Sequence, residues 1–289
     1  MKILLIGAYG QLGTEFRRFF EEHNIDYIPT STKEREGKNL VLDIANINKV
    51  KEVFSKYKFD VVINCSAYNY VDKAEEEWQK AYSINGLGVR NLAIESNKKS
   101  IPLVHYSTDY VFDGSKTTPF TIADIPNPLS KYGKSKLLGE NFLKSLTNKY
   151  ILIRVSWVFG KGGETNFIKK LIEWSKKGEV RVSTDEISAP TYTKTIVNAT
   201  WKLLEVEGFG IYHLSNEGEC SRYEYAKFIL ETLNWKGKLY EAKQEDFNLP
   251  ARRPKYSKLD NFGIKETIKI EIPHWKEVVE KYMKEELNL

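Results

Sequence analysis

Short apolar runs alternate with amphipathic segments through the first half of the chain. The apolar runs are typical of strands buried on both faces, and they cover residues 2–7, 25–30, 60–67, 102–112 and 150–160. The segments between them have the period of helices, which are predicted over residues 13–23, 48–57, 78–99 and 129–140. Strand and helix in this order predict an α/β fold, a Rossmann-type doubly wound parallel sheet. Its ligands would bind beyond the carboxyl ends of the strands.

The alternation loosens after residue 160. Further helices are predicted over residues 166–178, 192–206 and 221–233, the last with Ser221 as its N-cap, and strands over residues 179–183 and 210–216.

This change of pattern suggests two parts. We expect a dinucleotide-binding domain over residues 1–160, which residues 190–218 rejoin. Residues 161–189 and 219–289 would form a smaller C-terminal lobe that binds the substrate.

Three glycines follow the first predicted strand at a regular spacing. Gly7, Gly10 and Gly13 stand in GAYGQLG, between that strand and the first predicted helix. Glycines there permit a tight turn and let the backbone approach a pyrophosphate at the helix N-terminus. A turn without a ligand could have the same spacing. The position of this glycine motif between a strand and a helix favours a dinucleotide loop.

The end of the second predicted strand bears on the choice of nicotinamide cofactor. NAD-binding sites usually place an acid there to accept a hydrogen bond from the ribose 2′-hydroxyl. Here residues 29–35 read PTSTKER, so hydroxyls are followed by Lys33 and Arg35, and no acid occurs before Glu34. The segment favours the 2′-phosphate of NADPH, with NADH as the alternative, although a solvated turn would look similar.

Tyr132 and Lys136 stand four residues apart in LSKYGKSKLLGE, and on a helix they would share one face. A nearby ammonium favours the phenolate, so we expect it to lower the pKa of Tyr132. The tyrosine would donate a proton to a carbonyl oxygen while a nicotinamide delivers hydride to the carbon. Ser107 or Thr108, in the preceding strand, would hydrogen-bond the same oxygen. The pair alone occurs by chance, but its order after a glycine loop and a hydroxyl-bearing strand is much more specific.

The order and spacing of these motifs resemble the extended short-chain dehydrogenase/reductase superfamily and, within it, the dTDP-4-dehydrorhamnose reductases. The matching segments are ILLIGAYGQLG, DVVINCSAYNYVDKAE, HYSTDYVFDG, PNPLSKYGKSKLLGE, ILIRVSWVFG and SAPTYTKTIV, with a weaker RRPKYSKLDN. They cover nearly the whole chain. The resemblance implies an NAD(P)H-dependent enzyme that reduces the 4-keto group of dTDP-4-dehydro-L-rhamnose to give dTDP-L-rhamnose.

The resemblance also implies roles for particular residues. Tyr132 would be the proton donor, Lys136 its partner and ribose anchor, and Thr108 the hydroxyl that binds the carbonyl. Thr108, Asp109 and Trp157 match positions that contact the sugar. Cofactor contacts are implied for Gly7, Gly10, Gln11, Leu12, Gly13, Ser31, Asp43, Ile44, Ala67, Tyr68, Asn69, Tyr132 and Lys136.

Some of these positions depart from the family pattern or have a simpler explanation. Cys65 and Tyr68 are bulkier than the small residues usual there, and Tyr68 replaces a histidine usual beside the nicotinamide. Both changes bear on cofactor preference and substrate fit. Trp157 would equally suit core packing, and Asp43 would equally suit a helix N-cap.

Contacts to the substrate diphosphate and to a second subunit are less defined. Arg252 and Arg253 are candidates for the diphosphate, although an exposed basic turn explains them as well. Relatives form dimers, some through acidic residues and a metal ion. Only Glu15 is a candidate ligand here, so we expect no metal site and leave a homodimer open.

Two other functions are compatible with the motifs. The regulatory β subunit of methionine adenosyltransferase resembles these reductases and keeps much of the Y-x-x-x-K region, although the tryptophan of RVSWVFG favours the reductase. Another nucleotide-sugar reductase or an epimerase would share the scaffold. An epimerase holds its NAD through turnover and would be purified with it.

Composition excludes several classes of partner. The net charge is only +5 over 289 residues, without a concentrated basic stripe, so no nucleic acid is expected. Neither the two cysteines, Cys65 and Cys220, nor the four histidines have metal-ligand spacing. The first residues lack the pattern of a secretory signal, and no segment approaches the roughly 20 apolar residues of a membrane span. We therefore expect a cytoplasmic protein.

Overall fold

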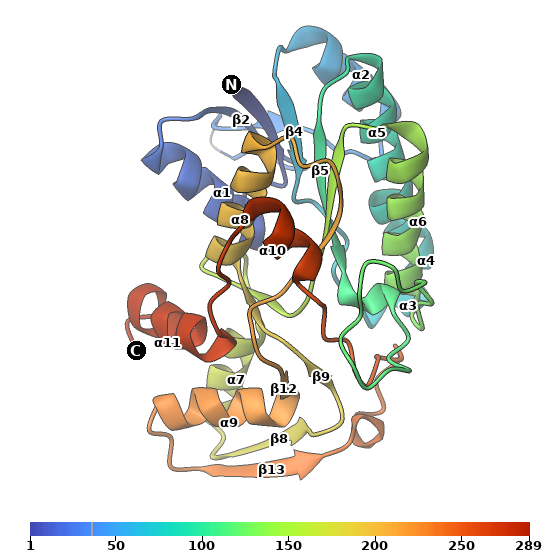
Figure 1. Ribbon diagram of the computed structural model, residues 1–289. Coiled ribbons are helices and arrows are strands. Elements are labelled where there is room, and N and C mark those ends of the chain that lie inside the picture. Colours follow the sequence, from blue (N-terminus) through green and yellow to red (C-terminus); the bar gives the residue numbers. More distant parts are fainter. Residues whose placement is uncertain (36) are drawn as a thin grey trace.

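A seven-stranded sheet forms the centre of the larger part of the molecule (Figure 1). The computed structural model describes residues 1–35 and 37–289. The strands lie in the order β11–β6–β5–β4–β1–β2–β3, and every neighbouring pair is parallel. Their bounds are β1 Lys2–Ile6, β2 Asp26–Ser31, β3 Leu40–Val41, β4 Val61–Asn64, β5 Leu103–Thr108, β6 Tyr150–Val155 and β11 Gly210–Leu214. The predicted Rossmann-type doubly wound sheet is confirmed.

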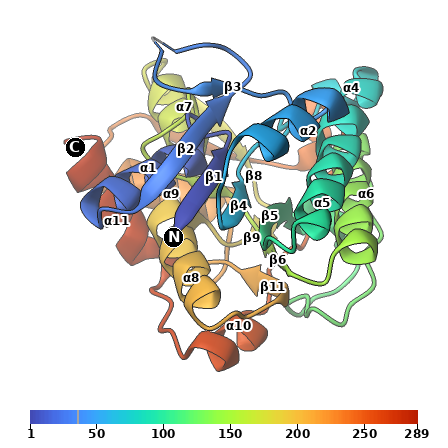
Figure 2. The same cartoon turned by 90° about the horizontal axis from the view of Figure 1, so that it is seen from above.

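Helices cover both faces of this sheet (Figure 2). One face carries α1 (Gln11–Glu22) and α8 (Thr193–Glu205), and the other carries α2 (Ile47–Lys56), α5 (Val89–Lys98) and α6 (Lys131–Leu146). Successive strand residues point to opposite faces. Ile3 and Leu5 therefore join the core that contains Phe16, whereas Leu4 and Ile6 join the core that contains Phe54. Burial on both faces explains why the strands read as continuous apolar runs.

A smaller group of elements lies below the carboxyl ends of the strands (Figure 1). Its helices are α7 (Phe167–Ser175), α9 (Arg222–Thr232) and α11 (Trp275–Glu286), and its main strands are β8 (Glu179–Ser183) and β13 (Lys238–Ala242), which pair in parallel. Its core is rich in aromatic residues, among them Phe159, Tyr192, Tyr225, Trp275 and Tyr282. The remaining elements are α10 (Phe262–Ile268), which packs on the large sheet beside α8, then β7 (Val158–Phe159), β9 (Ile187–Ser188), β10 (Thr191–Tyr192), β12 (Cys220–Ser221) and a 3₁₀ turn over Gln244–Phe247. The exact division into domains remains a prediction.

Several predicted strands end earlier than expected, and two of them are cut short by a change of backbone conformation at the edge of the sheet. The strand predicted over 102–112 stops at Thr108, because Asp109–Val111 forms a 3₁₀ turn that the Thr108 side chain caps. The strand predicted over 150–160 stops at Val155, because Trp157 adopts the left-handed conformation, with φ of 43°. Both breaks lie at the carboxyl edge of the sheet and turn side chains towards the small lobe.

The helix predicted over 78–99 is also interrupted. It consists of α4 (Trp78–Tyr82), a π-helical turn over Ser83–Gly88 and then α5, and a short helix, α3 (Lys73–Glu76), precedes it. Asn85, within the π-helical turn, bonds to both the amide and the carbonyl of Tyr68 and donates to the Ser135 hydroxyl. The irregular turn thus ties the loop after β4 to α6.

A buried ion pair joins α6 to the sheet. Arg154 on β6 and Glu140 on α6 are 2% and 0% exposed, and two hydrogen bonds of 3.1 and 2.7 Å connect their side chains. The remaining Arg154 nitrogen contacts His213 Nε2 at 3.2 Å. Burial and the Arg154 charge lower the pKa of His213 to about 3, so the imidazole is neutral and accepts this bond.

Removing one partner of this pair should strongly destabilise the fold. The variant Arg154→Met leaves the Glu140 carboxylate buried without its partner, which costs on the order of 3–5 kcal/mol. We expect a clear fall in the urea midpoint followed by circular dichroism. The matched control is Lys49→Met, which breaks an exposed ion pair between Lys49 and Glu52 of 2.8 Å and should leave the midpoint nearly unchanged. Equal effects in the two variants would contradict this account.

Candidate active site

A cleft of about 1130 Å³ lies between the carboxyl edge of the sheet and the small lobe. It contains the point where the strand order reverses, since β1 continues to β2 on one side and β4 to β5 on the other. Most of the predicted site residues meet there. The cleft is lined by Gly7, Gly10, Gln11, Leu12, Ser31, Asp43, Ile44, Ala67, Tyr68, Asn69, Thr108, Asp109, Tyr132, Lys136 and Trp157.

The glycine loop is shaped for close approach of a ligand to the backbone. Gly7 has a φ of 72°, and any side chain on Gly13 would collide with the Gly7 carbonyl oxygen. Gly13 does not line the cleft, and it serves instead to pack the helix against the loop. Helix α1 has Gly10 as its N-cap and no acid in its first turn. Its first amide groups are therefore suited to a pyrophosphate.

The part of the cleft beside the end of β2 carries a positive charge. Arg35 lines the cleft with Ser31 and Thr32, and its guanidinium lies 5.0 Å from the centre of the Tyr9 ring. Lys33, the other predicted cation, is exposed and does not line the cleft. The alternative role of Asp43 as a helix cap is wrong, because Asn46 caps α2 by accepting hydrogen bonds from two amides.

Tyr132 and Lys136 lie on the first turns of α6, which begins at the N-cap Ser130. Lys136 is 3% exposed, and its ammonium donates to the Tyr106 carbonyl oxygen on β5 at 2.6 Å. Thr108 ends the same strand, and its hydroxyl lies near the Tyr132 phenol. Ser107, the other candidate hydroxyl, is buried, and its oxygen has no partner within residues 1–35 and 37–289.

The pKa expectation for Tyr132 was wrong. Burial raises the pKa of Tyr132 to about 12, and Lys136 does not lower it. The reason is that the ammonium bonds to the Tyr106 carbonyl, and burial lowers the pKa of Lys136 itself to about 8 against the opposing charge of Glu140. Tyr132 is therefore a protonated phenol at neutral pH, which is the state that a proton donor requires.

Tyr68, the departure from the family pattern, is accommodated by its surroundings. The residue is buried, packs in a cluster with Ala74, Ala81 and Tyr132, and donates its hydroxyl to Glu77 at 3.1 Å. Asn85 fixes its backbone. The larger ring therefore forms part of the wall beside Tyr132.

The part of the cleft that the small lobe lines contains residues that the sequence motifs did not indicate. The Arg222 guanidinium lies 3.6 Å from the centre of the Trp157 ring and donates to Glu186 at 3.1 Å. Glu186 also accepts a hydrogen bond from the Tyr110 hydroxyl. Trp157 is thus both packed and exposed to the cleft. Arg222 and Glu186 come from separate elements of the small lobe, so no local spacing could have indicated them.

Two other candidates have defined positions. Arg253 lines the cleft and forms a 2.7 Å ion pair with Asp72, whereas Arg252 is exposed and lies outside it. Glu15 is 5% exposed and accepts a hydrogen bond from Thr193 within the same chain, so it does not present a surface ligand. No cluster of three or more potential metal ligands occurs in the described part of the chain.

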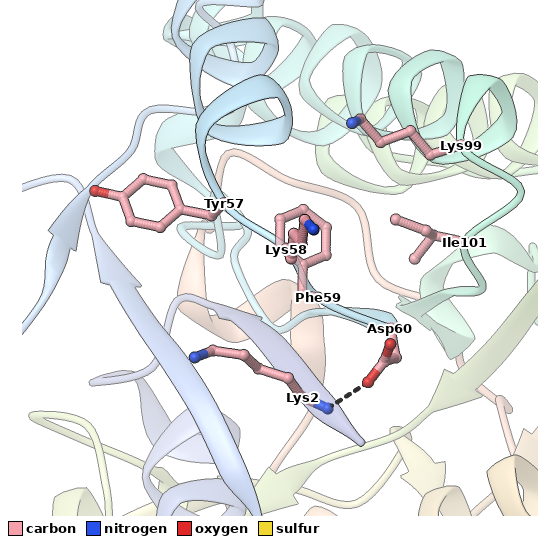
Figure 3. Close-up of a pocket in the computed structure, with 7 residues that line it drawn as sticks. All are labelled: Lys2, Tyr57, Lys58, Phe59, Asp60, Lys99 and Ile101. Atoms are coloured by element: carbon pink, nitrogen blue, oxygen red, sulfur yellow. Dashed lines mark hydrogen bonds between the residues drawn. The ribbon is translucent and has the colours of Figure 1, made fainter.

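A second hollow, of about 630 Å³, lies at the opposite edge of the sheet (Figure 3). It is lined by Lys2, Tyr57, Lys58, Phe59, Asp60, Lys99 and Ile101. Asp60 accepts a hydrogen bond from the Lys2 backbone amide at 2.7 Å. The hollow contains none of the predicted site residues.

Comparison with known proteins agrees with this arrangement. The model of the RmlD substrate binding domain family matches residues 1–288. The chain belongs to this family. In addition, none of the helices formed by the described residues has the length and apolar character needed to cross a membrane.

Similar proteins match over nearly their whole length. The spore coat polysaccharide biosynthesis protein SpsK of Bacillus subtilis is 38% identical over 98% of this chain and 97% of its own. The dTDP-4-dehydrorhamnose reductase of Escherichia coli is 31% identical over 99% of this chain and 98% of its own. A crystal structure of dTDP-4-dehydrorhamnose reductase from Bacillus anthracis in complex with NADP has a TM-score of 0.92 and 36% identity, covering 98% of this chain and 99% of that one.

Arg35 should make the protein prefer a 2′-phosphorylated dinucleotide. We expect Arg35→Ala to weaken NADP binding on the order of tenfold, because a charge-assisted contact to phosphate is lost, and to leave NAD binding nearly unchanged. Isothermal titration calorimetry measures both. Lys33→Ala is the matched control, since Lys33 lies outside the cleft. Equal losses of NADP affinity in both variants, or equal losses of NADP and NAD affinity in Arg35→Ala, would contradict the assignment.

Proposed function

We propose that this protein is an NAD(P)H-dependent reductase that converts the 4-keto group of dTDP-4-dehydro-L-rhamnose to the alcohol of dTDP-L-rhamnose. The observation that carries the proposal is the convergence of Tyr132, Lys136 and Thr108 in one cleft beside the glycine loop. Family membership and the named reductases among its relatives support the same reaction.

The glycine loop and α1 would hold the cofactor pyrophosphate, and Ser31, Arg35, Asp43 and Ile44 its adenosine end. Ala67, Tyr68 and Asn69 would contact its nicotinamide half. When bound, NAD(P)H supplies the hydride that reduces the carbonyl carbon.

Tyr132 would complete the reduction by giving its phenolic proton to the carbonyl oxygen. The raised pKa keeps this proton in place at neutral pH. Lys136, held by the Tyr106 carbonyl, places a positive charge beneath the site, where it stabilises negative charge that develops on oxygen. Thr108 would provide a second hydrogen bond to the same oxygen.

The small lobe would bind the rest of the substrate. Its part of the cleft carries Lys170, Arg181, Arg222 and Arg253, which suit a diphosphate, and aromatic side chains at Trp157, Phe167, Trp174 and Phe247. Because Arg253 already pairs with Asp72, a diphosphate there would compete with a carboxylate. A cytoplasmic location is also part of the proposal, whereas the homodimer stays open.

Turnover by wild type and by Tyr132→Phe tests the proposal. We expect the wild type to oxidise NADPH in the presence of dTDP-4-dehydro-L-rhamnose generated in situ. The variant should lose roughly 10²–10⁴-fold in kcat, because the phenyl ring keeps the packing but has no proton to give. The NADP affinity of the variant should stay within a few-fold of wild type.

Other outcomes would identify the alternatives. Wild-type protein that binds NADPH but turns over no nucleotide sugar would support a regulatory role. Turnover of a different keto sugar would assign another reductase, and protein purified with bound NAD would favour an epimerase. A Tyr132→Phe variant as active as the wild type would refute the role of Tyr132.

A further inference from the structure

The hydroxyl proton of Thr108 already has an acceptor. Thr108 Oγ1 donates to Asp109 Oδ1 at 3.1 Å, and the same oxygen accepts a hydrogen bond from the Tyr110 amide at 3.1 Å. A threonine hydroxyl has one proton to donate. While Asp109 takes that proton, Thr108 cannot donate it to a substrate carbonyl oxygen. The second hydrogen bond of the proposed mechanism therefore depends on Asp109.

Asp109 is held in place so that one of its oxygens meets Thr108. It lines the cleft but is only 2% exposed, so protein encloses most of its side chain. Its second oxygen, Oδ2, accepts hydrogen bonds from Ser257 at 2.6 Å and from Ser188 at 3.5 Å. These serines come from the C-terminal segment and from β9, so three distant parts of the chain enclose one carboxyl group.

Charged and titratable groups surround this carboxyl from several elements. Arg222 on α9 favours its ionised form, whereas Glu186, from the loop before β9, opposes it. Tyr132 on α6 and Tyr110 in the 3₁₀ turn also face it, and burial keeps the pKa of both phenols far above neutral. Of the Asp109 carboxyl and these two phenols, the carboxyl is the group whose pKa lies close to neutral pH.

We propose that Asp109 is a positioning residue that controls the direction of the Thr108 hydroxyl proton, and thereby the rate of carbonyl reduction. The ionised carboxylate accepts the proton and withdraws Thr108 from the substrate. The neutral acid instead donates its own proton to Thr108 Oγ1, and the Thr108 proton then turns to the carbonyl oxygen. The inference rests on the proposed function and assigns a further residue to it.

The electrostatics of the site also favour faster reduction when Asp109 is neutral. Burial raises the pKa of Asp109 to about 6, against the opposing hydrogen bonds from Ser257 and Thr108 and the charge of Arg222. The acid is therefore protonated below that pH and ionised above it. Protonation of Asp109 also removes a negative charge close to the substrate carbonyl oxygen, on which negative charge develops during reduction. Reduction should accordingly be faster at low pH.

The test is the pH dependence of kcat between pH 5 and 7.5 with saturating NADPH and keto sugar, corrected for acid decomposition of NADPH. In the wild type kcat should rise on the order of tenfold as the pH falls through the midpoint of the Asp109 titration. In Asp109→Asn it should be independent of pH and close to the low-pH value of the wild type. The amide can accept from the serines and donate to Thr108 at every pH, like the neutral acid.

Two further variants sharpen the test. Ser257→Ala removes a donor that favours the ionised carboxylate, so the midpoint should move to higher pH. The matched control, Asp113→Asn, changes a half-buried aspartate that follows the same 3₁₀ turn and has no hydrogen bond to Thr108 among the described residues, so it should keep the wild-type profile. Thr108→Val removes the hydroxyl, so it should abolish the hydrogen bond to the substrate carbonyl oxygen and the pH dependence of kcat.

Either of two results would overturn the inference: an unchanged pH profile in Asp109→Asn, or loss of its activity at every pH while NADPH still binds. Absence of any wild-type turnover would instead refute the proposed function. In that case ¹³C NMR of the Asp109 carboxyl and of Thr108 Cβ still decides the inference. Both resonances should titrate with one midpoint in the wild type, and Thr108 should not titrate in Asp109→Asn.

Discussion

The site depends on keeping a positive charge buried beneath the cleft. Lys136 is 3% exposed, and its ammonium bonds to the Tyr106 carbonyl at the end of β5. Burying an unpaired ammonium is costly, so the surroundings must compensate for it. Glu140, one turn further along α6, supplies a negative charge, and Arg154 holds that carboxylate from β6. The contacts that stabilise the ammonium thus also fix α6, and with it Tyr132, against the sheet.

The cleft joins two chemically different surfaces. The sheet contributes backbone groups and hydroxyls at the ends of its strands, together with a glycine loop open to a pyrophosphate. The small lobe contributes cations and aromatic rings. Arg222 stacks on Trp157 and donates to Glu186, which also accepts a hydrogen bond from Tyr110. Trp157 faces the cleft because its left-handed backbone ends the strand there. Cofactor and sugar would accordingly meet at the boundary of the two parts.

The fold and the presence of the glycine loop, Tyr132 and Lys136 in one cleft could be predicted from sequence because their signals are local. Apolar runs mark the strands, and Gly7, Gly10, Tyr132 and Lys136 stand at short, fixed spacings. The pKa of Tyr132 could not be predicted, because burial depends on the packed structure and outweighs the nearby ammonium. The enclosure of Asp109 by Ser188 and Ser257 also lay beyond sequence reasoning, since those contacts span 79 and 148 residues.

The most direct test of this account is the fate of the hydride. NADPH deuterated at C4 of the nicotinamide, on each face in turn, is incubated with the protein and dTDP-4-dehydro-L-rhamnose, and the product is analysed by NMR. The account predicts dTDP-L-rhamnose with deuterium at C4 of the sugar from one of the two labelled cofactors, and no deuterium elsewhere. Product without deuterium from either cofactor, or deuterium at another carbon, would contradict it.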